Sequence, residues 1–184
     1  PGVVQIILKE GWVGIVAESF AEALAAKRKL KVEWDIPKKW TEEGIREILR
    51  VGAGNKMVTQ KKGKALDSEE EGVESIEFTS PIGAHAQMEP NGAVAEVKDG
   101  KATIILSTQV IGVMQKQVAK ALGLKKEDVN IIPTYLGGGF GRRLTTEHAI
   151  VAAQMSQEVG KPVKYFFTRK EEFQNDTFRP PTHH

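Results

Sequence analysis

The chain has 184 residues, of which 40% are hydrophobic and 27% are charged, as is typical of one ordinary globular domain or two small ones. Its net charge of +2 gives no basis for binding nucleic acid or an anionic membrane surface, and no apolar run approaches the length that spans a bilayer. Because the chain contains no cysteine, it cannot by itself form a disulfide, a thiolate zinc site or an iron–sulfur cluster.

The N-terminal part predicts a small unit of strands and helices. Short β-branched runs at 3–8 and 12–17 predict two adjacent strands, and Ser19-Phe20-Ala21-Glu22 predicts a capped helix start. A third strand is expected at 30–34, where apolar and charged residues alternate. Thr41, followed by two glutamates and an apolar face, predicts the start of a second helix.

The pattern weakens at 51–72, where glycines and runs of charge predict a linker or exposed loop, and then becomes regular again. A hairpin is predicted over Asp99-Gly100. An apolar stripe of helical spacing stops at Gly123, and a helix rich in small residues stops at Gly160. The charged segment 169–179 is expected to be a loop. These signals place strands at 75–79, 92–97, 101–107, 129–132 and 163–168, and helices at 111–122 and from Thr145 or Thr146 to 159.

The most informative stretch is Leu136-Gly137-Gly138-Gly139-Phe140-Gly141-Arg142-Arg143. It lies between a predicted strand and a predicted helix, and glycine leaves no Cβ between peptide N–H groups and a ligand, so a phosphate is the first candidate. The Walker and dinucleotide motifs do not fit, because Arg142-Arg143 replaces the Lys-Ser or Lys-Thr pair and the glycine spacing differs. A plain turn would also explain the glycines, whereas Phe140 favours a wall beside a planar or buried ligand.

Three separated motifs, Met88-Glu89-Pro90, Ser107-Thr108-Gln109 and Gly137 to Arg143, occur in an order and spacing that resembles the large subunit of molybdenum hydroxylases of the xanthine oxidase family. Two further strings, His85-Ala86-x-Met88-Glu89-Pro90 and Thr168-Arg169-x-Glu171, are most similar to the isoquinoline 1-oxidoreductase β subunit.

The resemblance implies an α+β fold and a chain that is a middle slice of such a subunit. Residues 1–66 are expected to form part of an α/β-hammerhead domain with a linker, and residues 67–184 the N-terminal part of a molybdopterin-binding domain. The start at Pro1, without an initiator methionine, agrees with a piece of a longer protein. The compartment stays open between bacterial cytoplasm and periplasm, because an export signal would lie upstream.

The resemblance also implies the cofactor, which is molybdopterin with molybdenum, in bacterial relatives usually as the cytosine dinucleotide. The pterin dithiolene holds the metal, so no protein metal ligand is expected. Gln109 corresponds to the glutamine that donates a hydrogen bond to a molybdenum oxo group, and Arg142 would approach the cofactor's phosphates or another subunit. The implied cofactor-binding residues are Gln109, Gly138, Gly139, Phe140, Gly141 and Arg142.

The implied reaction is hydroxylation of an electron-poor carbon in an N-heterocycle or aldehyde, with oxygen taken from water. The purine-oxidising branch carries a glutamate at the position of Leu144, which argues against a purine substrate. The family's general base lies in a C-terminal portion that this chain lacks, so no catalytic residue is expected here and the isolated chain should be inactive. Glu147 is assigned to helix-cap electrostatics and His85 to packing.

Electrons would leave through iron–sulfur clusters on a small partner subunit, because this chain has no cysteine to bind them. The alternative from another functional class is a non-enzymatic nucleotide- or phosphate-binding module that uses the glycine-rich loop. A third possibility is a structural piece whose glycines only make a turn.

Overall fold

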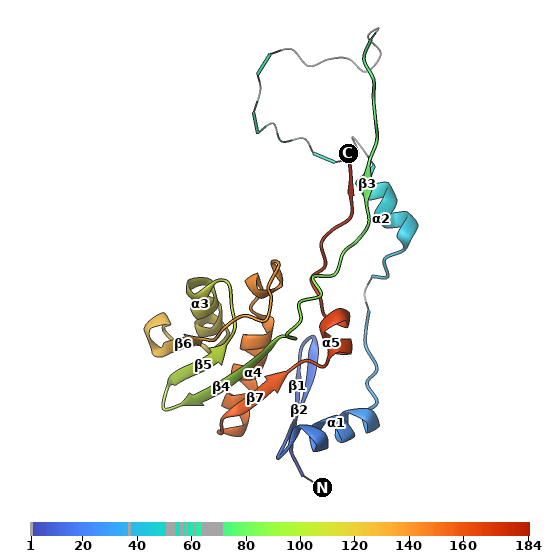
Figure 1. Cartoon of the computed structure of the whole chain (residues 1–184). Coiled ribbons are helices and arrows are strands. Elements are labelled where there is room, and N and C mark those ends of the chain that lie inside the picture. Colours follow the sequence, from blue (N-terminus) through green and yellow to red (C-terminus); the bar gives the residue numbers. More distant parts are fainter. Residues whose placement is uncertain are drawn as a thin grey trace. The chain divides into compact units, whose positions relative to one another are not determined.

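The computed structural model describes residues 2–36, 38–50, 54, 55, 57, 59, 60, 62, 63 and 72–184. These residues divide into two compact units, each made of sequence segments that lie far apart along the chain (Figure 1). The first unit takes its described residues from Pro1–Val32 and His85–Thr177, and the second from Glu33–Ala84 and Phe178–His184. The domain boundary predicted between residues 66 and 67 falls outside the described residues.

The first unit is built on a four-stranded sheet with the strand order β6-β5-β4-β7. β4 pairs antiparallel with β5 and with β7, whereas β5 and β6 are parallel and are joined through α3. The predicted hairpin is confirmed, and Asp99 and Gly100 both take the positive φ that its tight turn requires. The elements are β4 (Gly92–Lys98), β5 (Lys101–Leu106), α3 (Ile111–Leu122), η1 (Lys126–Asp128), β6 (Val129–Pro133), α4 (Glu147–Val159) and β7 (Val163–Phe166).

α3 and α4 cover one face of this sheet and form the core with it (Figure 1). Every second strand residue points into the core, as Ala95 and Ile104 do, and both are fully buried. The predicted stripe on α3 is confirmed by the buried Met114 and Val118. On α4 the buried positions are mostly small, which allows the helix to lie close to β4; they include Ala149, Ala152, Ala153 and Ser156.

An N-terminal hairpin and helix belong to the same unit. β1 (Val3–Lys9) pairs with β2 (Trp12–Ala17), and α1 (Phe20–Lys29) follows. Ser19 is the N-cap of α1, and its hydroxyl accepts a hydrogen bond from the Glu22 amide, as the sequence predicts. Ile7 packs with Met155 of α4 and Val163 of β7 in a second, smaller cluster, which attaches the hairpin to the sheet.

Three predicted elements differ from the structure. The segment 30–34 is not a strand, and its exposed residues find no pairing strand among the described residues. The strand expected at 75–79 is reduced to β3 (Thr79–Ser80). The segment 169–179 is not all loop, because α5 (Arg169–Gln174) begins at a capping box in which the side chains of Thr168 and Glu171 each accept the other residue's amide.

The second unit contains a helix and a short ribbon. α2 (Glu42–Leu49) is the predicted second helix, and Thr41 Oγ1 accepts a hydrogen bond from the Gly44 amide at 3.1 Å. β3 pairs with β8 (Thr182–His183) near the C-terminal end of the chain. The predicted mixture of helices and sheets is therefore confirmed for the described part of the chain.

Within those same described ranges, no helix is both long enough and apolar enough to cross a membrane.

Candidate cofactor-binding site

The glycine loop, residues 137–141, leaves β6 and enters a short 3-10 turn, η2 (Arg142–Leu144), before α4 begins. The Arg142 amide donates to Gly139 O at 2.8 Å and the Leu144 amide to Gly141 O at 3.1 Å, which closes the turn. The prediction that the next helix begins at Thr145 or Thr146 is confirmed for Thr146. The N-cap of α4 is Thr146, and it makes no side-chain capping bond.

Side chains of this chain pack against the positions where the loop glycines lack a Cβ. Three of them form a row at every second position of the segment before β4, which we call the polar row (His85, Gln87 and Glu89). The row runs antiparallel to the loop. A Cβ added to Gly137 would lie 2.4 Å from Glu89 Cβ, one added to Gly138 would lie 3.2 Å from Gln87 Cβ, and one added to Gly141 would lie 3.4 Å from His85 Nε2.

Gln109 takes the remaining place beside the loop. A Cβ on Gly139 would lie 2.7 Å from Gln109 Oε1, and that oxygen accepts a hydrogen bond from the Gly141 amide at 3.2 Å. The backbone amide of Gln109 in turn donates to Arg143 O at 3.2 Å. In the described part of the chain no acceptor is bonded to Gln109 Nε2, and the residue is exposed, so its N–H groups remain available to a ligand.

Phe140 lies between the glycines in an unusual backbone conformation. Its φ is +52°, in the left-handed region that residues other than glycine rarely adopt. The residue is 62% exposed. Backbone strain of this kind collects at ligand-binding loops. Phe140 therefore presents an apolar surface on the loop that also carries the Gln109 contact.

Arg143 links the three sequence motifs. Its side chain is completely buried, and its Nε donates to Gly138 O at 2.8 Å. One terminal nitrogen donates to Glu89 O at 2.7 Å and Glu89 Oε2 at 2.8 Å, and the other donates to Ser107 Oγ. Burial lowers the pKa of Arg143, while the charges of Glu89 and Glu172 raise it. The guanidinium thus joins the polar row, the end of β5 and the loop.

Arg142 is also buried, and its guanidinium binds other groups of the chain. Its Nε lies 2.9 Å from Glu172 Oε1 and 3.4 Å from Asp176 Oδ1. The other carboxylate oxygen of Glu172 accepts a hydrogen bond from the backbone amide of Asn91 at 2.6 Å. Cofactor contact through the Arg142 side chain, as the resemblance implies, would require these bonds to break.

His85 is held by the carboxylate of Asp176, which lies 91 positions later in the sequence. Asp176 accepts the His85 amide and lies with its other oxygen 2.8 Å from His85 Nδ1, and the two side chains are 3% and 9% exposed. Burial raises the pKa of Asp176, but hydrogen bonds from His85 and the charges of His85 and Arg142 outweigh it and hold that pKa below its usual range. The carboxylate is therefore ionised at neutral pH.

Several buried polar groups near this network have no hydrogen-bond partner among the described residues. They are the side-chain amides of Gln87 and Asn91 and both ring nitrogens of His148. Burial, together with the charges of Arg142 and Arg143, lowers the pKa of His148 to about 4, so its ring is neutral at physiological pH. Buried polar groups of this kind mark places where water or a ligand completes the bonding.

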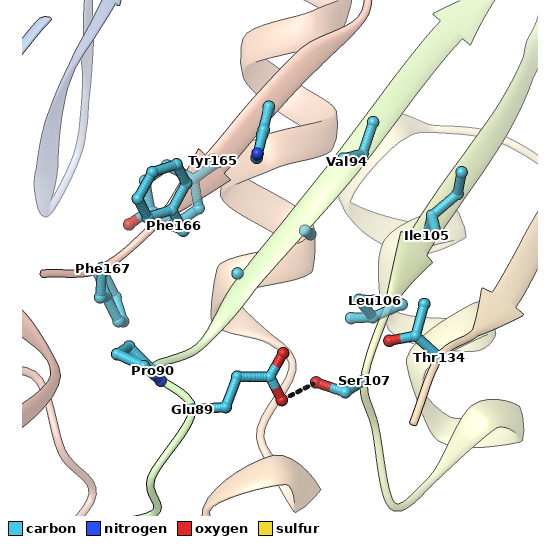
Figure 2. Close-up of a pocket in the computed structure, with 13 residues that line it drawn as sticks. Glu89, Pro90, Val94, Ile105, Leu106, Ser107, Thr134, Tyr165, Phe166 and Phe167 are labelled. Carbon is cyan, nitrogen blue, oxygen red and sulfur yellow. Dashed lines mark hydrogen bonds between the residues drawn. The ribbon is translucent and has the colours of Figure 1, made fainter. Parts of the chain in front are cut away.

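An apolar pocket of about 490 Å³ lies on the face of the sheet that α3 and α4 do not cover (Figure 2). Val94 and Ile105 form part of its floor, and Phe166 and Phe167 stand on one side. At its edge Ser107 Oγ donates to Glu89 Oε2 at 3.2 Å, so Glu89 belongs both to the pocket and to the polar row.

The chemistry of the loop differs from that of a phosphate cradle. The Gly137 amide donates to Glu89 Oε2 at 2.9 Å and the Gly141 amide to Gln109, so two of the loop's N–H groups are already bonded. A phosphate would also meet the negative charge of Glu89. A large ligand with polar edges fits better, because an exposed ring, unbonded Gln109 N–H groups and bare backbone lie together. No group of three or more described His, Asp or Glu residues is arranged to hold a metal ion.

The sequence predicts the loop and Gln109 as site residues, and the structure adds the residues that hold them. Arg143 was expected to be part of the loop motif without a role of its own, and Glu172 and Asp176 were placed in a loop. The only local signal for the polar row is the spacing of two between His85, Gln87 and Glu89.

Comparison with known proteins identifies the family. The profile of the family described as "Molybdopterin cofactor-binding domain" matches residues 50–184, which is more than half of the chain. The chain belongs to this family. It is the molybdenum-binding domain of the xanthine oxidase family, so the resemblance seen in the sequence is confirmed.

Two relatives illustrate the range of the family. The chain is 34% identical over 94% of its length to a "Membrane-bound aldehyde dehydrogenase [pyrroloquinoline-quinone]" of Gluconacetobacter polyoxogenes, of which it covers 23%. It is 28% identical over 97% of its length to the "Isoquinoline 1-oxidoreductase subunit beta" of Brevundimonas diminuta, of which it covers 25%. The chain thus spans about a quarter of the length of these relatives.

A solved structure shares the fold. Quinoline 2-oxidoreductase from Pseudomonas putida 86 superposes on 97% of this chain with a TM-score of 0.73, at 19% identity and over 29% of its own chain. At this identity the likeness concerns the fold alone.

Proposed function

We propose that this molybdopterin-binding domain belongs to the large subunit of a molybdopterin-dependent oxidoreductase that oxidises a carbon of an N-heterocycle or an aldehyde. One observation carries the proposal: Arg143 ties the polar row, the Ser107–Gln109 segment and the glycine loop into one site. All three motifs of the resemblance therefore contribute to a single surface.

The residues of the chain would bind and orient the cofactor. Gln109 would donate a hydrogen bond through Nε2, because its Oε1 is fixed on the Gly141 amide. The backbone from Gly138 to Gly141 would lie against the cofactor, with Phe140 as an apolar wall. When bound, the molybdenum–pterin group would supply the two-electron oxidation of a substrate carbon, with water as the oxygen source.

We also propose that the general base of the reaction lies outside this chain. The carboxylates near the loop already accept hydrogen bonds from groups of this chain. To act as a general base, each would have to lose those hydrogen bonds. Glu89 accepts from Arg143 and the Gly137 amide, Glu172 from Arg142, and Asp176 from His85. On this basis the 184 residues alone should be inactive.

The finer features of the proposal follow the resemblance. The cofactor would be the cytosine dinucleotide form, residues 1–66 would be part of an α/β-hammerhead domain, and an iron–sulfur small subunit would accept the electrons. The two relatives named above carry an aldehyde and an isoquinoline in their names, and both substrate classes stay within the proposal. Purine is left out because Leu144 offers no carboxylate.

Cofactor loading of a glycine variant tests the proposal. Gly141→Val in the complete enzyme should abolish the molybdenum and pterin content, because Gly141 has a φ of +101° and lies on the loop backbone. Gly123→Val is the matched control, since Gly123 also has a positive φ of 69° but has open space around it and caps α3. Normal cofactor content in the Gly141 variant would contradict the role of the loop.

A further inference from the structure

The His85–Asp176 pair has a geometry that packing alone does not require. Two hydrogen bonds, from the His85 amide and from Nδ1, hold the residue on one carboxylate. Asp176 is fixed in turn by Arg142, whose Nε lies 3.4 Å away. A carboxylate held between an imidazole and a guanidinium is ionised, so in the neutral ring the proton resides on Nδ1.

This tautomer leaves Nε2 as a hydrogen-bond acceptor, and Nε2 is the ring atom that faces the loop. It lies 3.4 Å from the position that a Cβ of Gly141 would occupy. No described residue donates to Nε2, while the Gly141 amide is bonded to Gln109. His85 and Gln109 therefore flank the same glycine, one with a free acceptor and the other with free donors.

The charges around His85 come from both elements that pack against it. Asp176 follows α5, and Arg142 and Glu172 lie behind Asp176 on η2 and α5. The ring itself is nearly enclosed, with 9% of the side chain exposed. An acceptor that is oriented by a carboxylate and has no donor in the described part of the chain is expected to meet one from a ligand.

We propose that His85 is a cofactor-binding residue whose Nε2 accepts a hydrogen bond from an N–H group of the pterin on the glycine loop, and that Asp176 is the residue that positions it. The inference rests on the proposed function. It adds a side-chain acceptor to a site in which the resemblance implies the donors Gln109 and Arg142, the ring of Phe140 and the glycine backbone. Together His85 and Gln109 would bind a ligand edge that carries both an acceptor and a donor.

Two substitutions at His85 separate this role from packing. His85→Asn keeps an amide N–H close to the place of Nδ1 and so retains the bond to Asp176, but it removes Nε2. His85→Gln reaches the place of Nε2 with an oxygen that can accept, but it loses the Nδ1 bond. The proposal predicts that the glutamine variant resembles the wild type more closely than the asparagine variant does. A packing role predicts the opposite order.

The experiment uses the complete enzyme purified from cells supplied with molybdate. The readouts are molybdenum and pterin per subunit, the rate of cofactor loss during dilution, and the Mo(V) electron paramagnetic resonance spectrum. His85→Asn should lose cofactor about two- to tenfold faster than the wild type, as expected for one hydrogen bond, and His85→Gln should lose it less quickly. His183→Asn, the same change at a half-buried histidine that pairs with Glu77, is the control.

The assignment of His85 is overturned if His85→Asn loses cofactor more slowly than His85→Gln, or at the same rate. Failure of the proposed function looks different, because wild-type enzyme would then carry neither molybdenum nor pterin. If His85→Asn does not fold, Asp176→Asn supplies the test, since an asparagine can donate to Nδ1 and shift the ring proton to Nε2. A loaded Asp176 variant with wild-type cofactor retention and spectrum would also overturn the assignment.

Discussion

Replacing Arg143 by methionine tests whether one buried guanidinium holds the site together. The Arg143 side chain is fully buried. The change removes two of its hydrogen bonds, to Gly138 O at 2.8 Å and to Glu89 O at 2.7 Å. Both carbonyls are only partly buried, so the cost of about 1–3 kcal/mol for a fully buried carbonyl left without a donor is an upper bound for each. The two carbonyls together give at most about 2–6 kcal/mol, and relief from burying a charge lowers this, so we expect a loss of about 2–4 kcal/mol. The carboxylate of Glu89 adds little, because its side chain is 46% exposed and can be hydrated.

Urea unfolding followed by circular dichroism measures this loss as a lower midpoint with an unchanged slope. Lys9→Met is the control, because it breaks the exposed pair with Glu158 in the same unit and should cost about 0–1 kcal/mol. Hydrogen exchange gives a local readout, since the Gly137 and Gly141 amides should lose protection only in the Arg143 variant. A loss below about 1 kcal/mol with both amides still protected would refute the reasoning.

Two further predictions concern activity and pH. In the complete enzyme Gln109→Ala should lower turnover by about one to two orders of magnitude while molybdenum content stays normal, because a preorganised donor is lost; unchanged turnover would remove Gln109 from the site. Folding stability should fall as the pH drops from 6.5 to about 4, because the unfolded state protonates His148 while the folded state keeps it neutral. The lowering of the His148 pKa from 6.5 to about 4 corresponds to a loss of about 3 kcal/mol in the free energy of unfolding. His148→Leu should therefore flatten this part of the stability curve. An equally steep curve in that variant would show that His148 is not the titrating group; Asp176, whose pKa lies below its usual value of 3.8, acts only at lower pH.

Local sequence signals predicted the elements whose stability is local. Asp99-Gly100 specifies its own turn, and Met114 and Val118 repeat at the spacing of a buried helix face. The strand expected at 30–34 is absent because alternation predicts a strand only where a partner exists to pair with it. α5 was missed because its charged residues resemble a loop, although the capping pair Thr168 and Glu171 was present in the sequence.

The candidate site could be predicted only in part. The glycine loop and Gln109 stand out by composition and resemblance, but the bonds that hold them join residues far apart in the chain. Arg143 and Glu89 are separated by 54 positions, and His85 and Asp176 by 91. No pattern along the sequence specifies such pairs, since a spacing of two in the polar row indicates only a shared face.

The central claim is that the glycine loop and its flanking side chains bind a molybdenum-carrying pterin. The most direct measurement is the metal and organic cofactor content of the complete protein, purified from cells grown with molybdate. Elemental analysis and pterin fluorescence should find molybdenum and pterin in equimolar amounts with the chain, and no quinone. Protein that lacks both, or that carries pyrroloquinoline quinone in their place as the name of one relative suggests for that relative, would contradict the account.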